Sequence, residues 1–262
     1  MGRPVGLVGS PSPSASWTYR FLLTAVGGIG RWLFGFRTEV VGLDRLPRDD
    51  AGRPVGGWIA AGLPHRTWVD PFVVALGLPV EPRLVFFGDG RAIFRSRWRR
   101  WVFRRVGGVI PIWPGGGRAA IESHLVAASA ALDAGAILCL FPETGAATPP
   151  GTARPLGLGV AYFGLRTGAP IVPIVLGGTH DLYRGRRFRM EMLPALSARG
   201  LAGLDDAEAP PEPWSAEERA AAHRIVEALH ALTAGPVERA HLATEPAPGS
   251  RKRWRWLTTA WH

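Results

Sequence analysis

The chain has 262 residues, which is enough for one α/β domain with a substantial buried core. Its 47% hydrophobic and 20% charged residues exclude wholesale disorder, and its single cysteine excludes a disulfide framework or a cysteine-based zinc site. Lys and Arg outnumber Asp and Glu by 31 to 21, and the net charge of +10 predicts an anionic partner; eleven tryptophans favour a membrane surface, because Trp is common in the headgroup region.

The N-terminal part predicts a flexible leader over residues 1–16 and an apolar helical segment over 17–37. Arg31 interrupts the segment, which is short for a bilayer span of about 20 apolar residues. Two interpretations stay open: a helix that lies in the membrane interface, or a helix that packs into the protein core.

Strand and helix patterns alternate over residues 38–195, which predicts an α/β domain. Short apolar runs bounded by glycine and proline predict strands, and longer alanine-rich or amphipathic runs predict helices. Arg186–Leu193 alternates charged and apolar residues, as in an edge or half-exposed strand. The other predicted strands are Thr38–Val41, Val55–Ala61, Arg83–Phe87, Gly108–Ile112, Ala136–Phe141 and Pro170–Leu176. A short helix is predicted to begin at Asp70, with Asp70 as its N-cap. The other predicted helices cover 92–106, Gly117–Ala134 and Leu156–Thr167. We expect a single domain with a mixed, largely parallel sheet flanked by helices.

The C-terminal part predicts an acidic linker over 196–214, a helix over 215–234 and a basic aromatic tail over 235–262. Ser215 and Glu218 form the capping-box pattern that begins the helix. Seven arginines with interleaved aromatic residues lie between 91 and 105, and with the tail they predict contact with anionic lipid, coenzyme A phosphates or an acidic carrier protein. A solvated charged face is the alternative for the arginine-rich stretch. A nucleic-acid-binding protein is the competing class, but the sequence carries no recognised nucleic-acid motif, so no nucleic acid is expected as a partner.

His65 and Asp70 are the strongest candidates for chemistry. His65 follows a predicted strand and Asp70 begins the next helix, so both lie at the C-terminal end of a strand, where α/β proteins bind ligands. A carboxylate on one imidazole nitrogen fixes the tautomer and leaves the other nitrogen as a base. From these two residues alone, a capping aspartate beside a surface histidine is the alternative. No spacing of histidines and carboxylates predicts a metal site, and His180 is interpreted as a loop histidine.

Three further blocks accompany this pair: Gly108–Ile112, Phe141-Pro142-Glu143 and Pro170–Pro173. In this order and spacing, the four blocks resemble the motifs of the glycerolipid acyltransferase family, the acylglycerol-phosphate acyltransferases and their relatives. His65–Asp70 matches the family's H-x4-D motif, and the three blocks match its Ile-Pro strand, its Phe-Pro-Glu-Gly motif and its late Pro-x-x-Pro motif. The resemblance covers about residues 35–195.

The resemblance implies transfer of a fatty acyl group from acyl-CoA or acyl-carrier protein to the hydroxyl of a lysophospholipid such as 1-acylglycerol-3-phosphate, in phospholipid biosynthesis. It implies His65 as the general base and Asp70 as its partner, with Glu143, Thr144 and Gly145 in the acceptor site. It implies no metal and no cofactor beyond the thioester co-substrate. It also implies a peripheral or monotopic protein on the cytoplasmic face of the cell membrane, with the anionic membrane surface as a partner.

Three cations that are common in the family are replaced in this chain. The arginine after the Phe-Pro-Glu block is missing, Trp113 and Pro114 follow the Ile-Pro block, and Leu156-Gly157-Leu158 stand where a basic residue is common. Arg118 and Arg154 are the nearby candidates for binding an acceptor phosphate, which favours bidentate arginine contacts. The same chemistry on a different, non-phosphatidate polar lipid is therefore the alternative.

Overall fold

Seven strands form one sheet in the computed structural model, which describes residues 17–91, 96–97, 108–113, 117–144, 149–205 and 210–246. The strands are β1 (Arg37–Val41), β2 (Trp58–Leu63), β3 (Leu84–Asp89), β4 (Val109–Ile112), β5 (Ile137–Leu140), β6 (Ile171–Gly177) and β7 (Arg187–Met192). Their order across the sheet is β1-β7-β6-β2-β5-β3-β4, and neighbours are parallel except β6 and β7. The predicted mixed, largely parallel sheet is confirmed.

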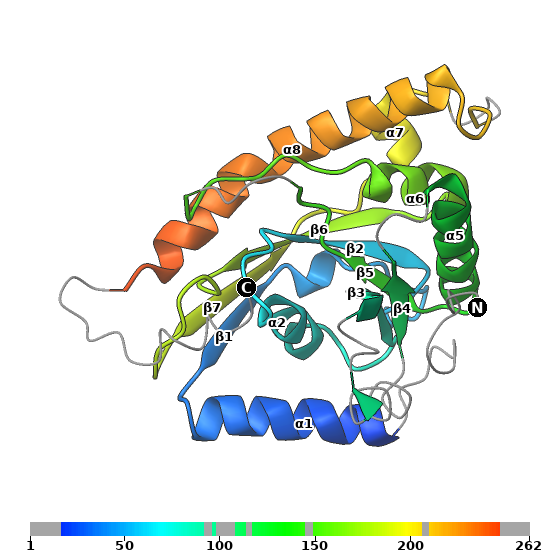
Figure 1. The fold of residues 1–262 in the computed structure, drawn as a ribbon. Coiled ribbons are helices and arrows are strands. Elements are labelled where there is room, and N and C mark those ends of the chain that lie inside the picture. The colour runs from blue at the N-terminus through cyan, green and yellow to red at the C-terminus, as the bar shows by residue number, and fades with distance from the viewer. Residues whose placement is uncertain are drawn as a thin grey trace.

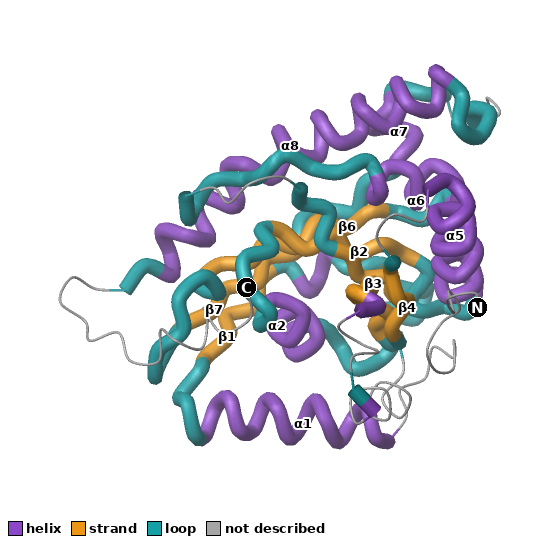
Figure 2. The backbone as a smooth tube through the Cα atoms, viewed as in Figure 1, coloured by secondary structure: helices purple, strands orange, loops and turns teal. Residues whose placement is uncertain are grey.

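Helices cover both faces of the sheet (Figures 1 and 2). On one face, α5 (Gly117–Asp133), α6 (Gly159–Thr167), α7 (Ala198–Ala202) and α8 (Ala216–Thr244) contribute buried side chains to a shared core. On the other face, α1 (Trp17–Trp32) and α2 (Asp70–Gly77) contribute to a second core. A short 3-10 turn, η1 (Leu43–Arg45), follows β1. The result is a three-layer α/β/α domain.

The central strands are apolar throughout because both of their faces are covered. Every residue of β2 is buried, and its side chains alternate between the two cores with the period of two that strand geometry imposes. Ile59 and Ala61 pack on the side of α5 to α8, whereas Trp58 and Ala60 pack on the side of α1 and α2. This burial fixes the position of the residues that directly follow β2.

The predicted segment over 17–37 contains α1 and then the first residue of β1. Tyr19 and Leu23 of α1 are buried in the second core, whereas Trp17 and Trp32 are 74% and 90% exposed, respectively. The close approach to α2 depends on Gly27, where an added Cβ would lie 3.0 Å from the Leu76 side chain. One face of α1 therefore packs into the core, and its opposite face is exposed. Within the described residues, no helix has the length and apolar character needed to cross a membrane.

β7 is not the edge strand that its alternating sequence allowed. It lies between β1 and β6, and β1 occupies the edge beside it. The half-exposed alternative is confirmed, since Phe188, Met190 and Met192 are buried while the residues between them are only partly covered. The predicted leader over 1–16 lies outside the described residues, as does nearly all of the predicted helix over 92–106.

α8 runs past the predicted end at residue 234 and continues to Thr244, with Pro236 inside it. Proline and glycine disfavour a helix interior, but packing on β6 outweighs that cost here. Val237 and Ala240 are buried, and an added Cβ on Gly177 of β6 would lie 2.3 Å from the Ala240 carbonyl oxygen. Residues 235–244 of the predicted tail are therefore helical, and residues 247–262 lie outside the described part of the chain.

The predicted acidic linker begins as a packed part of the domain. Leu196 and Ile171 exchange two backbone hydrogen bonds of 2.8 Å, which extend the sheet beyond β7. Ala198 and Ala202 of α7 are then buried against the helical layer. The apolar residues of this stretch pack into the domain. The prediction of a linker is therefore wrong for residues 196–205.

Candidate active site

Two loops at the same edge of the sheet bring the candidate residues together. β2 leads into His65, and β5 leads into Phe141 and Glu143. Because β2 and β5 are parallel neighbours, both loops leave the C-terminal edge of the sheet, where α/β proteins commonly bind ligands. The His65 and Glu143 blocks, far apart in the sequence, are therefore adjacent in the fold.

The His65 ring contacts the Asp70 carboxylate at 2.9 Å, from Nδ1 to Oδ2. Asp70 is fully buried, whereas the His65 side chain is 43% exposed. Oδ2 also accepts the backbone N–H groups of Arg66 and Thr67, each at 2.7 Å. Since this oxygen acts as an acceptor, Nδ1 carries the hydrogen and Nε2 keeps its lone pair on the exposed ring. A histidine arranged in this way can accept a proton from a bound hydroxyl group.

Asp70 is not the N-cap of α2, as its sequence position suggested. α2 begins at Asp70 itself, and the capping position is Val69, which makes no side-chain cap. The carboxylate points back to the loop that carries His65 rather than to the amides of its own helix. Its other oxygen, Oδ1, is buried and accepts no hydrogen bond from the described residues. Asp70 thus organises the loop between His65 and the helix.

Phe141 supports the His65 ring from the neighbouring strand. The two rings stack with centroids 4.3 Å apart and an interplanar angle of 24°. This placement requires glycine at position 62, because an added Cβ there would lie 2.5 Å from the Phe141 ring. The imidazole is therefore oriented by a carboxylate at one edge and by an aromatic ring on one face.

Glu143 lies inside the protein rather than in an open acceptor site. Its side chain is 2% exposed, and Oε2 accepts the backbone N–H of His65 at 3.0 Å. Oε1 accepts the backbone N–H of Arg154 at 3.4 Å, and the Arg154 Nε lies 3.9 Å from Oε2. The carboxylate thus ties the backbone of His65 to the loop that follows β5.

Thr144 belongs to the same loop closure, since its backbone N–H donates to the Pro155 carbonyl at 2.9 Å. Gly145, the third residue predicted in the acceptor site, lies outside the described residues. Arg154 lies beside Glu143, with a side chain that is 19% exposed. The structure therefore brings Thr144 and Arg154 to the region of His65 by way of Glu143.

Arg118 is engaged elsewhere. It lies in the first turn of α5, where Nε donates to Glu122 at 3.2 Å. Its guanidinium lies over the ring of Trp214, 4.9 Å from the centroid, at the start of α8. The structure thus gives Arg118 a role in packing α5 against the start of α8.

Arg66 is a site residue that motif comparison did not single out. Its Nη2 donates to the backbone carbonyls of Thr152 at 2.5 Å and Pro149 at 3.3 Å. Burial lowers the pKa of Arg66, and the nearby Glu143 carboxylate opposes that shift. The only signal in the sequence was its position directly after His65. Arg66 holds the far part of the post-β5 loop close to the His65 loop.

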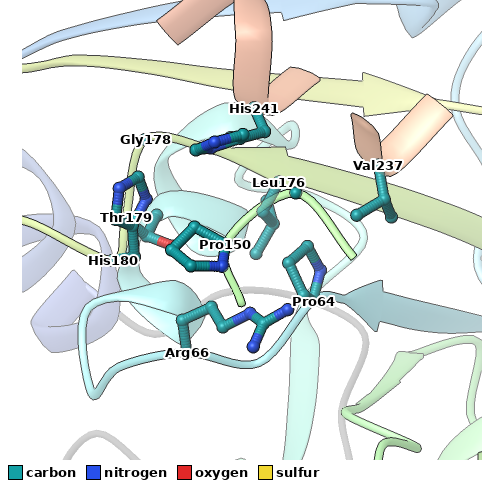
Figure 3. Close-up of a pocket in the computed structure, with 11 residues that line it drawn as sticks. Pro64, Arg66, Pro150, Leu176, Gly178, Thr179, His180, Val237 and His241 are labelled. Carbon is teal, nitrogen blue, oxygen red and sulfur yellow. The ribbon is translucent and has the colours of Figure 1, made fainter. Parts of the chain in front are cut away.

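A small open pocket lies beside the His65 loop and is lined by Pro64 and Arg66 but not by His65. His180 and His241 line its other side, and Pro150 lies between them and Arg66 in Figure 3. Burial lowers the pKa of His180 to about 4, with smaller contributions from Arg186 and His241. The predicted loop histidine thus lies in a pocket next to the candidate active site.

Cys139 does not offer a nucleophile. It lies in β5, it is fully buried, and burial raises the pKa of its thiol. The thiolate is the nucleophilic form of cysteine, so this side chain is unreactive at neutral pH. The groups of this region that can take part in proton transfer are therefore the histidine and the carboxylates described above.

Comparison with known proteins agrees with this geometry. A family model described as "Acyltransferase" matches residues 37–177, which include all four sequence blocks. No curated protein matches the chain significantly. Among solved structures, the chain is similar to the 1-acyl-sn-glycerophosphate (LPA) acyltransferase PlsC from Thermotoga maritima, with a TM-score of 0.54 and 17% sequence identity over 89% of this chain and 83% of that chain. Because the family model spans more than half of the sequence, the chain belongs to the acyltransferase family, and the family resemblance drawn from its four motifs is confirmed.

Proposed function

We propose that this protein transfers a fatty acyl group from an acyl thioester, acyl-CoA or acyl-carrier protein, to the hydroxyl of a lysophospholipid such as 1-acylglycerol-3-phosphate, in phospholipid biosynthesis. The observation that carries the proposal is the 2.9 Å contact between an exposed His65 ring and the fully buried Asp70 carboxylate. The fold of a 1-acyl-sn-glycerophosphate acyltransferase, which the chain shares, supports the same assignment.

In the proposed reaction, the acceptor hydroxyl attacks the thioester carbonyl while Nε2 of His65 takes its proton. The ester C–O bond forms, the thioester C–S bond breaks, and the thiol leaves with the proton from the imidazolium. Asp70 stabilises that imidazolium and keeps Nε2 directed at the substrate. General-base catalysis of this kind contributes on the order of 10²–10⁴ in rate, and positioning of the two substrates supplies the rest. The step needs no cofactor beyond the thioester.

The acceptor lipid is the least constrained part of the proposal. Two arginines near Glu143 already contact the protein: Arg66 donates to loop carbonyls, and Nε of Arg154 lies 3.9 Å from the Glu143 carboxylate. A phosphate acceptor would have to compete for these guanidinium groups. Polar lipids without a phosphate monoester are therefore the second candidate acceptors for the same chemistry, and they belong in the test.

We further propose that the protein binds the cytoplasmic face of the membrane peripherally through α1. Trp17, Phe21 and Trp32 are about one and three helical turns apart and therefore share a face. All three are exposed, by 74%, 65% and 90% respectively. An exposed aromatic face on a protein with a net charge of +10 suits the interface of an anionic membrane.

The function is tested with purified protein in mixed micelles, using a long-chain acyl-CoA or an acyl-carrier protein as donor. Lysophosphatidic acid, other lysophospholipids and a lysolipid without phosphate are supplied one at a time, and products are identified by mass spectrometry. The proposal predicts an acylated product with at least one acceptor and one donor. Hydrolysis of the thioester at an equal rate with every acceptor and with none would contradict it.

A further inference from the structure

Three side chains from two separate parts of the fold converge at the pocket beside the His65 loop. His180 lies in the loop between β6 and β7, and His241 and Glu245 lie one turn apart at the end of α8. Their nearest nitrogen and oxygen atoms all lie within 4.8 Å of one another, and Nε2 of His241 is 3.3 Å from Oε1 of Glu245. The rings of His180 and His241 are 5.2 Å apart. Figure 3 shows both imidazoles on the same side of the pocket.

We propose that His180, His241 and Glu245 form a binding site for a divalent transition metal of the zinc class. Two histidines and one carboxylate are a donor set that zinc uses in proteins, with open positions left for water. Ligand atoms bonded to one tetrahedral zinc at about 2.0–2.1 Å lie about 3.4 Å apart. The three side chains are therefore within a small rotation of a common metal, and the half-exposed Glu245 side chain is free to make it.

The two segments that carry these ligands are already held together by a buried arginine. Arg186 is fully buried, and its Nε donates to the Gly178 carbonyl at 2.7 Å. Its Nη1 donates to the Thr244 carbonyl at 2.8 Å. Gly178 precedes His180 by two residues, and Thr244 lies next to Glu245, so Arg186 fixes the backbone on both sides of the site. Such preorganisation favours metal binding, because the ligands need little ordering.

Charged groups of both signs surround the site. Arg186 and His241 act on His180 in one sense, and the carboxylates of Asp181 and Glu245 act in the opposite sense. Asp181 thus adds a carboxylate beside the proposed ligands, while Arg66 lines the other side of the pocket. The pocket that the two histidines line is open, so solvent water can complete the coordination.

A metal in this site would brace the loop that holds Asp70. The Thr67 hydroxyl donates to the Thr179 carbonyl at 3.0 Å, and Thr179 is the residue before His180. The Thr67 backbone N–H donates in turn to Asp70. The site is therefore separate from the groups proposed to act on substrate, but it is connected to them through two buried hydrogen bonds. Its role would be structural, joining the end of α8 to the loop that carries the general base.

The test is a Co²⁺ titration of the full-length, untagged protein after removal of metals with a chelator, followed by visible absorption and by competition with Zn²⁺. We expect one tight site per chain. His180→Ala and His241→Ala should each weaken binding by more than about tenfold, and Glu245→Gln should weaken it by a smaller factor. The matched control is His223→Ala, which removes an exposed histidine from the same helix and should leave binding unchanged.

Absence of a stoichiometric site in the wild-type protein would overturn the proposal, and so would equal affinity in the wild type and both alanine variants. Circular dichroism of each apo variant shows that it is folded, and His180→Asn replaces His180→Ala if the latter is not. The wild-type titration is decisive without any variant. The readout is independent of acyl transfer, so failure of the proposed enzymatic function would leave this result interpretable.

Discussion

At the scale of single residues, the site is organised by carboxylates that bind backbone amides. Asp70 accepts two loop amides besides the His65 ring, and Glu143 accepts the amide of His65 itself. Both side chains are almost fully buried, whereas the imidazole is accessible. In the proposed reaction, the histidine is the group that meets substrate, and the two carboxylates position it.

Asp70→Asn is expected to lower kcat by about 10²–10⁴ while preserving the fold. The amide oxygen of asparagine can still accept the two loop amides, but an uncharged group neither supports the imidazolium nor fixes the tautomer. Initial rates of thiol release and circular dichroism of the same preparation check this prediction. A variant with unchanged kcat would show that Asp70 serves only the loop.

Kinetics of a Glu143 variant distinguish two roles for this side chain: binding the acceptor, or positioning His65. If its carboxylate positions His65, as the geometry indicates, Glu143→Gln should lower kcat by roughly tenfold with little change in the acceptor KM, because a glutamine oxygen still accepts one amide. If Glu143 binds the acceptor directly, KM for the acceptor should rise with kcat nearly unchanged. Steady-state kinetics at saturating donor distinguish the two outcomes.

The sequence identifies this site only in part. The H-x4-D and Phe-Pro-Glu blocks locate His65, Asp70 and Glu143, because their chemistry depends on residue type and short spacing. Sequence spacing does not reveal that Glu143 is buried, or that Arg118 packs on Trp214 instead of facing the site. Such facts depend on contacts between residues far apart in the chain. The convergence of His180 with His241 is a further case.

At the scale of elements, strands β2, β5 and β6 are predictable because both faces are buried and the sequence is continuously apolar. The position of β7 between β1 and β6 is not predictable from the sequence. Alternating charged and apolar residues indicate that one face of a strand is covered, but they do not indicate which strands lie beside it. α8 passes its predicted end because Val237 and Ala240 pack on β6. Helix-breaking residues such as Gly235 and Pro236 end a helix only where no tertiary contact opposes them.

The Arg166–Glu218 pair joins α6 to α8 and is the clearest buried ion pair between described elements. Nε and Nη2 of Arg166 donate to the two carboxylate oxygens at 2.6 and 2.8 Å, and Ser215 caps the helix by accepting the Glu218 amide at 3.0 Å. We expect Glu218→Gln to lower the free energy of unfolding by about 1–3 kcal/mol, because it removes the carboxylate that pairs with a guanidinium that is 18% exposed and also lies over the Trp214 ring. Glu39→Gln, at the exposed end of the Arg189 pair, should cost no more than about 1 kcal/mol. Urea unfolding of both variants checks the difference, and equal losses would contradict the assignment.

The same pair predicts a pH dependence of stability. Burial alone would raise the pKa of Glu218, but the Arg166 guanidinium and the Trp214 amide outweigh it and hold that pKa below its ordinary value. A depressed carboxyl pKa stabilises the fold above its unfolded value and loses that contribution as the pH falls through the folded pKa. In acid, the wild type should therefore lose stability more steeply than Glu218→Gln. Parallel acid-unfolding curves for the two proteins would show that the pair contributes nothing to the transition.

At the scale of the whole molecule, the C-terminal edge of the sheet carries the site, and α1 presents an aromatic face that no described element covers. The double variant Trp17→Ala/Trp32→Ala should weaken binding to anionic vesicles by on the order of tenfold, the equivalent of about 1.4 kcal/mol. Leu242→Ala is the control, since it removes a 64% exposed side chain from α8. Co-sedimentation with vesicles at two salt concentrations measures the effect. Equal losses in the two variants would place the membrane contact elsewhere.

The measurement that tests the central claim most directly is acceptor-dependent thiol release by the wild type and by His65→Ala, with vesicle binding and circular dichroism recorded for both. The account predicts that the variant folds and binds vesicles like the wild type but loses transfer by about 10²–10⁴. Retention of acceptor-dependent transfer in a folded His65→Ala protein would contradict the assignment of His65 as the general base.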